Sequence, residues 1–332
     1  MRYVFVCLLV LTSQTAEAQW WSFENRSYYD PLIAGVREPH LSALFPATAT
    51  RMSFMVDKRN PRIVWDIDVD AEIPIFGRES ALTANDLGVG EWGVGLWIPI
   101  DFHMIEDFID ESGPIVNTDY RFGAMVKFRR GIAENRWVAA RLHFGHESTH
   151  LGDEFSIRGQ QTFPDDFERI NVSWEYLDLG GMYEWHAGQQ VWGVRAGVTS
   201  TFPFGDSYYQ VGPGTVSVSA KGPLTESTNW WDPYIGLEFH REALFFNDTF
   251  DAYASTELRW RSVYDYHKAD PDAAEEKQPS VNVIVGIKKT GTGRGIGRAS
   301  PFFRVYHGVN PHGQFRDQKD FTEIGFGVRL VR

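Results

Sequence analysis

The sequence predicts an all-β fold, an antiparallel transmembrane β-barrel of about 12 strands that follows a short N-terminal segment. Three observations lead to this prediction: long segments in which apolar and polar residues alternate, connections that alternate between short and long, and an aromatic content of 15%. A tilted strand needs about 9–11 residues to cross a membrane, whereas strands of soluble proteins average about five or six. Segments of the longer kind favour a barrel over the alternative fold, a soluble periplasmic β-sandwich.

The chain begins with the features of a secretory signal peptide over residues 1–18. Arg2 is followed by an apolar stretch, and Ala16-Glu17-Ala18 is a small-x-small cleavage site, which predicts a mature start at Gln19. The only cysteine, Cys7, lies inside this signal, so the mature chain is predicted to lack disulfides, thiolate metal sites and cysteine nucleophiles. The net charge of −12 disfavours binding to nucleic acid.

Residues 19–48 show no clear periodicity, and we predict that they plug or cap a barrel formed by residues 49–332. The predicted strands are 50–58, 62–78, 91–102, 118–129, 136–150, 169–185, 190–204, 229–241, 250–263, 279–289, 299–308 and 320–331. Short connections are predicted near 130–135, 186–189, 242–249 and 290–298, and long ones near 103–117, 151–168, 205–228, 264–278 and 309–319. Because outer-membrane barrels have short periplasmic turns and long external loops, this alternation orients the predicted barrel.

The two faces of the predicted strands differ in polarity. Apolar faces are formed by Trp92, Val94, Leu96, Ile98 and Ile100, by Phe122, Ala124, Val126 and Phe128, and by Ile324, Phe326, Val328 and Leu330. These faces are predicted to contact lipid, since a charged side chain there costs about 2–4 kcal/mol at the bilayer midplane. Six polar residues are predicted to point inward and to nearly close the lumen, which disfavours a wide porin: Arg121, Lys127, Arg141, His143, Glu175 and Arg195.

The segment 136–150 combines this pattern with a cluster of reactive side chains. Its apolar face, which carries Val138, Ala140, Leu142 and Phe144, continues into His146, Ser148 and His150. An acidic turn, Gly152-Asp153-Glu154, follows. We therefore expect His146 and Ser148 near the external end of a lipid-facing strand.

Around this cluster the chain resembles a known bacterial family. The resemblance is carried by the string from His146 to Phe155, by Pro31-Leu32-Ile33-Ala34-Gly35 with Arg37-Glu38-Pro39, by Asp119-Tyr120-Arg121-Phe122-Gly123, and by Phe167-Glu168-Arg169-Ile170-Asn171. These residues resemble the family catalogued as domain of unknown function 1207. The resemblance implies an outer-membrane barrel but no established activity.

One hypothesis for the cluster is a zinc protease, because His146-Glu147-Ser148-Thr149-His150 matches H-E-x-x-H. That motif requires a helix, where both histidines reach one metal ion. On a strand the same two residues are roughly 13 Å apart, which is too far for shared coordination. We therefore predict no zinc site there.

A second hypothesis is an acyl hydrolase. On a strand His146 and Ser148 share a face and lie roughly 6.6 Å apart, so their side chains can converge. The His-x-Ser pair is similar to that of outer-membrane phospholipase A and of lipid A deacylases, which implies Ser148 as nucleophile and His146 as general base. The third group is left open among Asp153, Glu154, Glu168 and Asn171, and Thr149 departs from the Asn or Gly that often follows the serine. The predicted substrate is an acyl ester of lipopolysaccharide or phospholipid, with calcium as a candidate cofactor.

The alternative is a barrel without catalysis, with a role in envelope structure or passive transport of small solutes. His146, Ser148 and Thr149 would then belong to the membrane interface, and Asp153 and Glu154 would bind cations that bridge lipopolysaccharide. Under either hypothesis the expected partners are outer-membrane lipid and the barrel-assembly machinery, with no nucleic acid.

Overall fold

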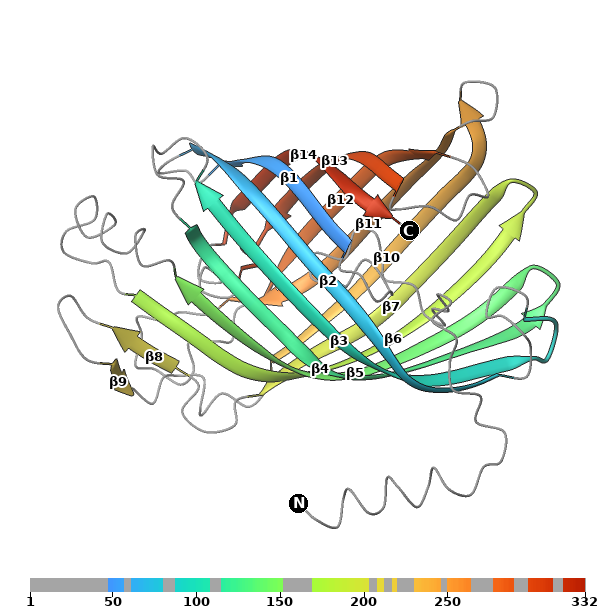
Figure 1. Ribbon diagram of the computed structural model, residues 1–332, viewed down its shortest axis with the longest axis horizontal. Helices are drawn as coiled ribbons and strands as arrows, with labels where there is room; N and C mark the ends of the chain where they lie inside the picture. Colours follow the sequence, from blue (N-terminus) through green and yellow to red (C-terminus); the bar gives the residue numbers. More distant parts are fainter. Residues whose placement is uncertain are drawn as a thin grey trace, which may run out of the picture.

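The computed structural model describes residues 47–56, 61–79, 87–107, 115–151, 169–202, 208–211, 217–219, 230–245, 250–263, 277–289, 298–312 and 319–331. Within these ranges the chain forms strands β1 (Ala47–Val56), β2 (Pro61–Glu79), β3 (Trp92–Asp107), β4 (Ile115–Ala133), β5 (Arg136–Leu151), β6 (Arg169–Ala187), β7 (Gln190–Phe202), β8 (Tyr208–Val211), β9 (Ser217–Ser219), β10 (Trp230–Phe245), β11 (Phe250–Ser262), β12 (Lys277–Lys289), β13 (Arg298–Gly308) and β14 (Phe321–Val331) (Figure 1). The described residues contain no helix that is long and apolar enough to cross a membrane.

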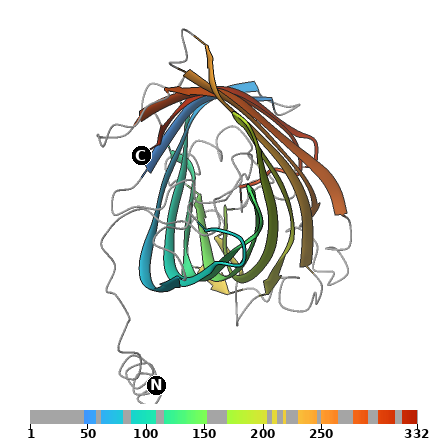
Figure 2. The same ribbon diagram turned by 90° about the vertical axis from the view of Figure 1, so that its right-hand side faces the viewer.

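Twelve of these strands form a transmembrane β-barrel, as predicted. Each pairs antiparallel with the strands before and after it, β1 pairs with β14, and β5 pairs with both β4 and β6. The twelve strands therefore form a closed ring of pairings. The short strand β8 pairs with the start of β6, and β9 pairs with β8. Figure 2 shows these strands curving around a common axis. The long strands β2, β4 and β6 have 19 residues each. A strand that crosses a membrane requires about 9–11 residues.

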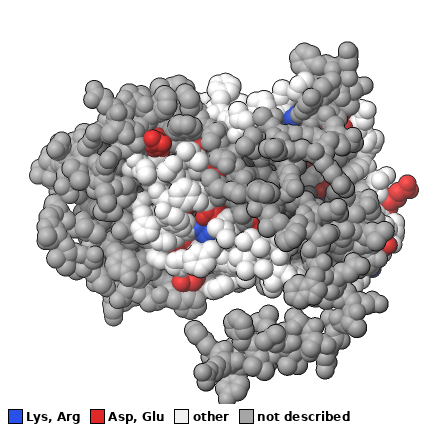
Figure 3. Space-filling view, in the orientation of Figure 1, with Lys and Arg blue, Asp and Glu red and all other residues white. Residues whose placement is uncertain are grey.

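Alternation in sequence produces the outer and inner faces of this wall, because successive side chains of a strand point to opposite sides. Large apolar side chains are exposed on the outside, and among them are Phe122, Val126, Ile98, Leu179 and Phe326. Figure 3 shows one outer face on which the described residues are mostly uncharged. An exposed apolar surface of this kind suits contact with hydrocarbon rather than water.

The inner face is lined with buried charged groups that pair with each other, either between neighbouring strands or across one intervening strand. Ion pairs join Lys127 to Glu72, Arg129 to Glu184, Arg141 to Asp178, Arg195 to Glu238, and Arg304 to Glu323. Pairing compensates the cost of removing these charges from water. The predicted inward orientation of Arg121, Lys127, Arg141, His143 and Arg195 is therefore confirmed, whereas that of Glu175 is wrong, as shown below.

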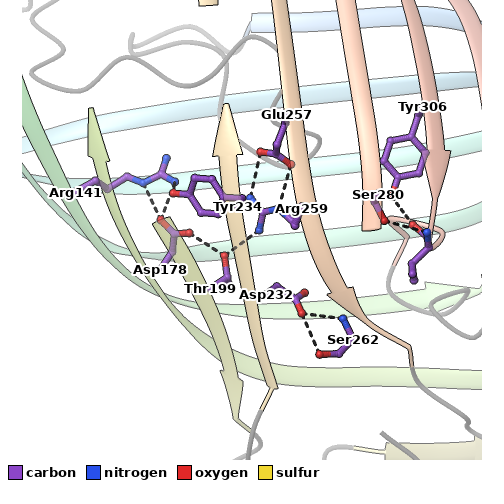
Figure 4. A network of polar contacts seen from close by, with 11 residues as sticks. Arg141, Asp178, Thr199, Asp232, Tyr234, Glu257, Arg259, Ser262, Ser280 and Tyr306 are labelled. Atoms are coloured by element: carbon purple, nitrogen blue, oxygen red, sulfur yellow. Dashed lines mark hydrogen bonds and ion pairs between the residues drawn. The ribbon is translucent and has the colours of Figure 1, made fainter. Parts of the chain in front are cut away.

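A network of polar contacts links β5, β6, β7, β10 and β11 inside the barrel (Figure 4). Arg141 binds the Asp178 carboxylate, which also accepts a hydrogen bond from Thr199. Thr199 in turn accepts one from Arg259, and Arg259 lies over the Tyr234 ring at 4.3 Å from its centroid. Side chains from five strands thus contact one another within the lumen.

The segment after β13 folds back into the barrel. The Val309 amide donates to Ser280 Oγ at 3.0 Å, and the Tyr306 hydroxyl donates to the Val309 carbonyl (Figure 4). Asn310 and His312 are almost completely buried. This segment therefore contributes side chains to the lumen.

Several predicted boundaries differ from the structure. β3 continues to Asp107 and β4 begins at Ile115, so the connection predicted near 103–117 is shorter than expected. β1 begins at Ala47, inside the predicted N-terminal segment, and β8 and β9 lie within a predicted loop. The signal peptide and the rest of the N-terminal segment lie outside the described residues.

Candidate active site on the outer face of β5 and β6

The outward face of β5 carries the residues that the sequence analysis singled out. Trp137, Ala139, Arg141, His143 and Glu147 are buried on the lumen side, while the alternate positions face outward. His146 and Ser148 therefore lie on the lipid-facing side, as the periodicity predicts. Register with β6 pairs His146 with Glu175 and Ser148 with Ser173. Two polar residues of each strand thus meet on the outside of the barrel.

Three of these side chains form a hydrogen-bonded relay. His146 Nδ1 lies 3.2 Å from Glu175 Oε1, and His146 Nε2 lies 3.2 Å from Ser173 Oγ. A carboxylate beside Nδ1 favours the tautomer that carries its proton there, so that Nε2 accepts a hydrogen bond from the Ser173 hydroxyl. Serine, imidazole and carboxylate in this order are the groups that serine hydrolases use as nucleophile, base and orienting acid.

Ser148 has a different partner from the one predicted. Its Oγ lies 2.9 Å from His150 Nε2, and it makes no hydrogen bond with His146. The His146–Ser148 pair that their spacing allows is therefore not formed, because the His146 ring extends across to β6 rather than along β5. Ser148 still lies beside this relay, as the direct strand partner of Ser173.

The relay is only partly accessible. The side chains of His146 and Glu175 are 29% and 18% exposed. The Phe122 ring lies on one side of the imidazole, with 5.2 Å between ring centroids. Nearer the start of β5, Leu142 and Phe144 are exposed and apolar. The polar groups thus adjoin an apolar surface that suits acyl chains.

The carboxylate that contacts His146, Glu175, was not among the groups predicted to do so. Asp153 and Glu154 lie outside the described residues, and Asn171 belongs to the part of β6 whose side chains are not described. Glu175 was predicted to face the lumen because β6 carries apolar residues on both faces, including the buried Trp174. Alternate residues of a strand point to the same side, so Glu175 points outward like the exposed Leu179, four residues later.

A family model described as "Protein of unknown function (DUF1207)" matches residues 24–212, more than half of the chain. The chain belongs to the DUF1207 family. This match covers both strands of the relay, and it confirms the resemblance found in the sequence. No curated protein matches the sequence.

Solved structures of outer-membrane proteins show a distant likeness to the DUF1207 chain. Outer membrane phospholipase A from Escherichia coli is 12% identical, with 90% of this chain and 92% of that chain covered and a TM-score of 0.44. The translocator domain of autotransporter NalP from Neisseria meningitidis is 8% identical, with 87% of each chain covered and a TM-score of 0.45. LpxR from Salmonella typhimurium is 10% identical, with 86% and 100% covered and a TM-score of 0.37. Since a phospholipase and a translocator domain match equally, these likenesses carry no information about activity.

Proposed function

We propose that this chain hydrolyses acyl esters of membrane lipids at the outer face of its barrel. Ser173 is the nucleophile, His146 the general base and Glu175 the group that orients the imidazole. The observation that carries the proposal is the Ser173–His146–Glu175 relay, with both contacts at 3.2 Å. Its position on the lipid-facing side makes a lipid the accessible substrate.

The relay suits a two-step acyl transfer. Ser173 Oγ attacks the ester carbonyl while His146 Nε2 takes the hydroxyl proton. When the carbon–oxygen bond of the ester breaks, the imidazolium returns this proton to the leaving alcohol. Water then attacks the acyl-serine by the same route and releases the fatty acid. Glu175 keeps the imidazole in the required tautomer and stabilises the imidazolium.

The substrate class follows from the surface beside the relay. Phe122, Leu142 and Phe144 are 45–57% exposed and offer an apolar bed for an acyl chain. The ester bond of a phospholipid or of lipopolysaccharide lies where polar headgroup meets hydrocarbon. A polar relay at the edge of an apolar surface matches that boundary.

The proposal implies a location in the bacterial outer membrane. The exposed apolar face would contact hydrocarbon, and lipopolysaccharide or phospholipid would be the lipid partner. Export through the signal peptide of residues 1–18 and insertion by the barrel-assembly machinery belong to the same proposal. Membrane fractionation of cells that express the full chain tests this location.

The activity is tested by fatty-acid release from phospholipid and from lipid A in mixed micelles, followed by mass spectrometry. Calcium is present in one arm of the experiment and chelated in the other. The attack on the ester carbonyl produces an oxyanion, which needs a hydrogen-bond donor or a cation to stabilise it. We expect His146→Gln to lower the rate by about 10²–10⁴-fold, and Ser173→Ala to abolish it. Ser200→Ala is the matched control, because Ser200 also faces outward, on β7 beside Leu177.

Ser148→Ala distinguishes the two serines. We expect it to retain most of the activity, because Ser148 bonds to His150 instead of His146. Loss of activity in Ser148→Ala but not in Ser173→Ala would transfer the nucleophile to Ser148, as the sequence spacing predicts. No release above the Ser173→Ala level with either lipid, by folded protein, would refute hydrolysis and leave a barrel without catalysis.

A further inference from the structure

A second cluster of reactive side chains lies on the opposite side of the barrel wall, facing the lumen. Asp66 on β2, His103 on β3 and His312 after β13 each offer a ligand atom, and these atoms lie within 4.8 Å of one another. Their exposed fractions are 1%, 4% and 1%. The cluster shares no residue with the relay on β5 and β6.

Strand register brings the wall residues of this cluster together. His103 pairs directly with Asp68 on β2 and with Asp119 on β4. His103 Nε2 lies 2.6 Å from Asp66 Oδ1, and Nδ1 lies 3.4 Å from Asp68 Oδ1. Two carboxylates therefore contact one buried imidazole, and a third belongs to its direct strand partner. A cation would be strongly favoured at such a position.

His312 completes the cluster from the segment that folds back into the barrel. Its ring meets the His103 ring edge to face, with 4.7 Å between centroids. Its Nδ1 is buried without a hydrogen bond and lies 3.9 Å from Asp119 Oδ2. A buried nitrogen without a hydrogen bond requires an explanation, and a role as a metal ligand would provide one. A neutral imidazole has a free lone pair for a metal ion.

We propose that Asp66, His103 and His312 bind a divalent transition-metal cation, with zinc as the best fit. Two imidazoles and one carboxylate are typical zinc ligands, whereas calcium and magnesium prefer oxygen ligands alone. Zinc–ligand bonds of about 2.0–2.2 Å separate tetrahedral ligand atoms by roughly 3.4 Å. The His103 Nε2–Asp66 Oδ1 distance of 2.6 Å is shorter than that value, and all three ligand atoms lie within 4.8 Å of one another, so modest side-chain rotations would complete the site.

Asp68 and Asp119 are suited to a supporting role. Asp68 Oδ1 lies near His103 Nδ1 at 3.4 Å, and a carboxylate in that position orients a metal-bound imidazole. Asn117 Nδ2 donates to Asp119 Oδ1 at 2.9 Å, which fixes the carboxylate nearest to His312. The bound cation would join the segment after β13 to β2 and β3. The site would therefore hold an external connection inside the barrel.

The test is metal binding by the refolded full chain in detergent, with Zn²⁺, Co²⁺, Ca²⁺ and Mg²⁺ as probes. We expect one equivalent of Zn²⁺ by competition with a chromophoric chelator, and visible absorption of a four-coordinate Co²⁺ complex. We expect His312→Gln to lower the Zn²⁺ affinity by at least 100-fold. The barrel should still fold, because His312 lies outside the strands. His307→Gln is the matched control, because His307 is exposed and bonds to Thr322 instead.

X-ray absorption of the zinc-loaded wild type provides a second measurement that needs no variant. Two imidazoles with one or more oxygen ligands are expected around the ion. Preference for calcium or magnesium, no zinc binding, or unchanged zinc affinity in both His312→Gln and His103→Gln would each overturn the proposal. Because the outer relay is separate, loss of metal binding and loss of ester hydrolysis are distinguishable outcomes.

Discussion

Asp178 holds the central position in the lumenal network, so its removal should destabilise the barrel strongly. Its carboxylate accepts two hydrogen bonds from Arg141, at 3.0 Å and 2.7 Å, and one from Thr199 at 2.8 Å. Asp178 and Arg141 are only 5% and 4% exposed. The variant Asp178→Leu leaves the Arg141 guanidinium buried without its carboxylate.

The magnitude follows from the loss of that buried pair. Removal of one partner of a buried ion pair costs about 3–5 kcal/mol. We therefore expect the free energy of unfolding of Asp178→Leu to fall by about this amount. The double variant Arg141→Met/Asp178→Leu should recover most of the loss, because neither charge then remains buried.

The assay is reversible urea unfolding in phospholipid vesicles, followed by tryptophan fluorescence and by heat-modifiable migration on gels. Arg130→Gln is the control, because Arg130 is exposed. A change below about 1 kcal/mol for Asp178→Leu, within the range of an ordinary substitution, would refute the reasoning. A double variant Arg141→Met/Asp178→Leu whose free energy of unfolding is no higher than that of Asp178→Leu would refute it as well.

Three further predictions concern other parts of the wall. Lys127→Met leaves the buried Glu72 carboxylate without its ion pair and should cost about 3–5 kcal/mol in the same unfolding assay, with Lys127→Met/Glu72→Gln less affected. Asn135 has a φ of 55° in the turn before β5, so Asn135→Val should cost about 1–2 kcal/mol, whereas equal loss in Asn135→Gly would contradict this explanation. His146→Phe/Glu175→Leu should abolish ester hydrolysis without lowering stability in vesicles, and a less stable double variant would show that the pair supports the fold.

The fold was largely predictable because a barrel depends on a local period of two. The exposed Phe122 and the buried Lys127 both follow it. The ends of the strands were not predictable in the same way. At the end of β3, the buried Ile105 is apolar and points to the same side as the polar His103. The two faces no longer differ there, so periodicity cannot mark where the strand ends.

The candidate sites were only partly predictable because they depend on register between strands. His146 was found from its own strand, but its partners Ser173 and Glu175 come from β6, after a long connection. Nothing in the local sequence fixes which residue of β6 faces His146. The lumenal cluster depends still more on register, since His312 reaches His103 from the far end of the chain.

The relay is polar, whereas much of the outer face is apolar, and this difference in polarity supports a functional role for its residues. A polar pair costs free energy on a surface that contacts hydrocarbon, and apolar residues of similar size would avoid that cost. At the outward positions of β5 before His146, Leu142 and Phe144 are apolar, as the environment favours. The outward positions after it, Ser148 and His150, are polar and are bonded to each other. His146 and Glu175 depart from that rule together and are bonded to each other and to Ser173. Departures that form one hydrogen-bonded unit are expected where chemistry, rather than stability, determines the residues.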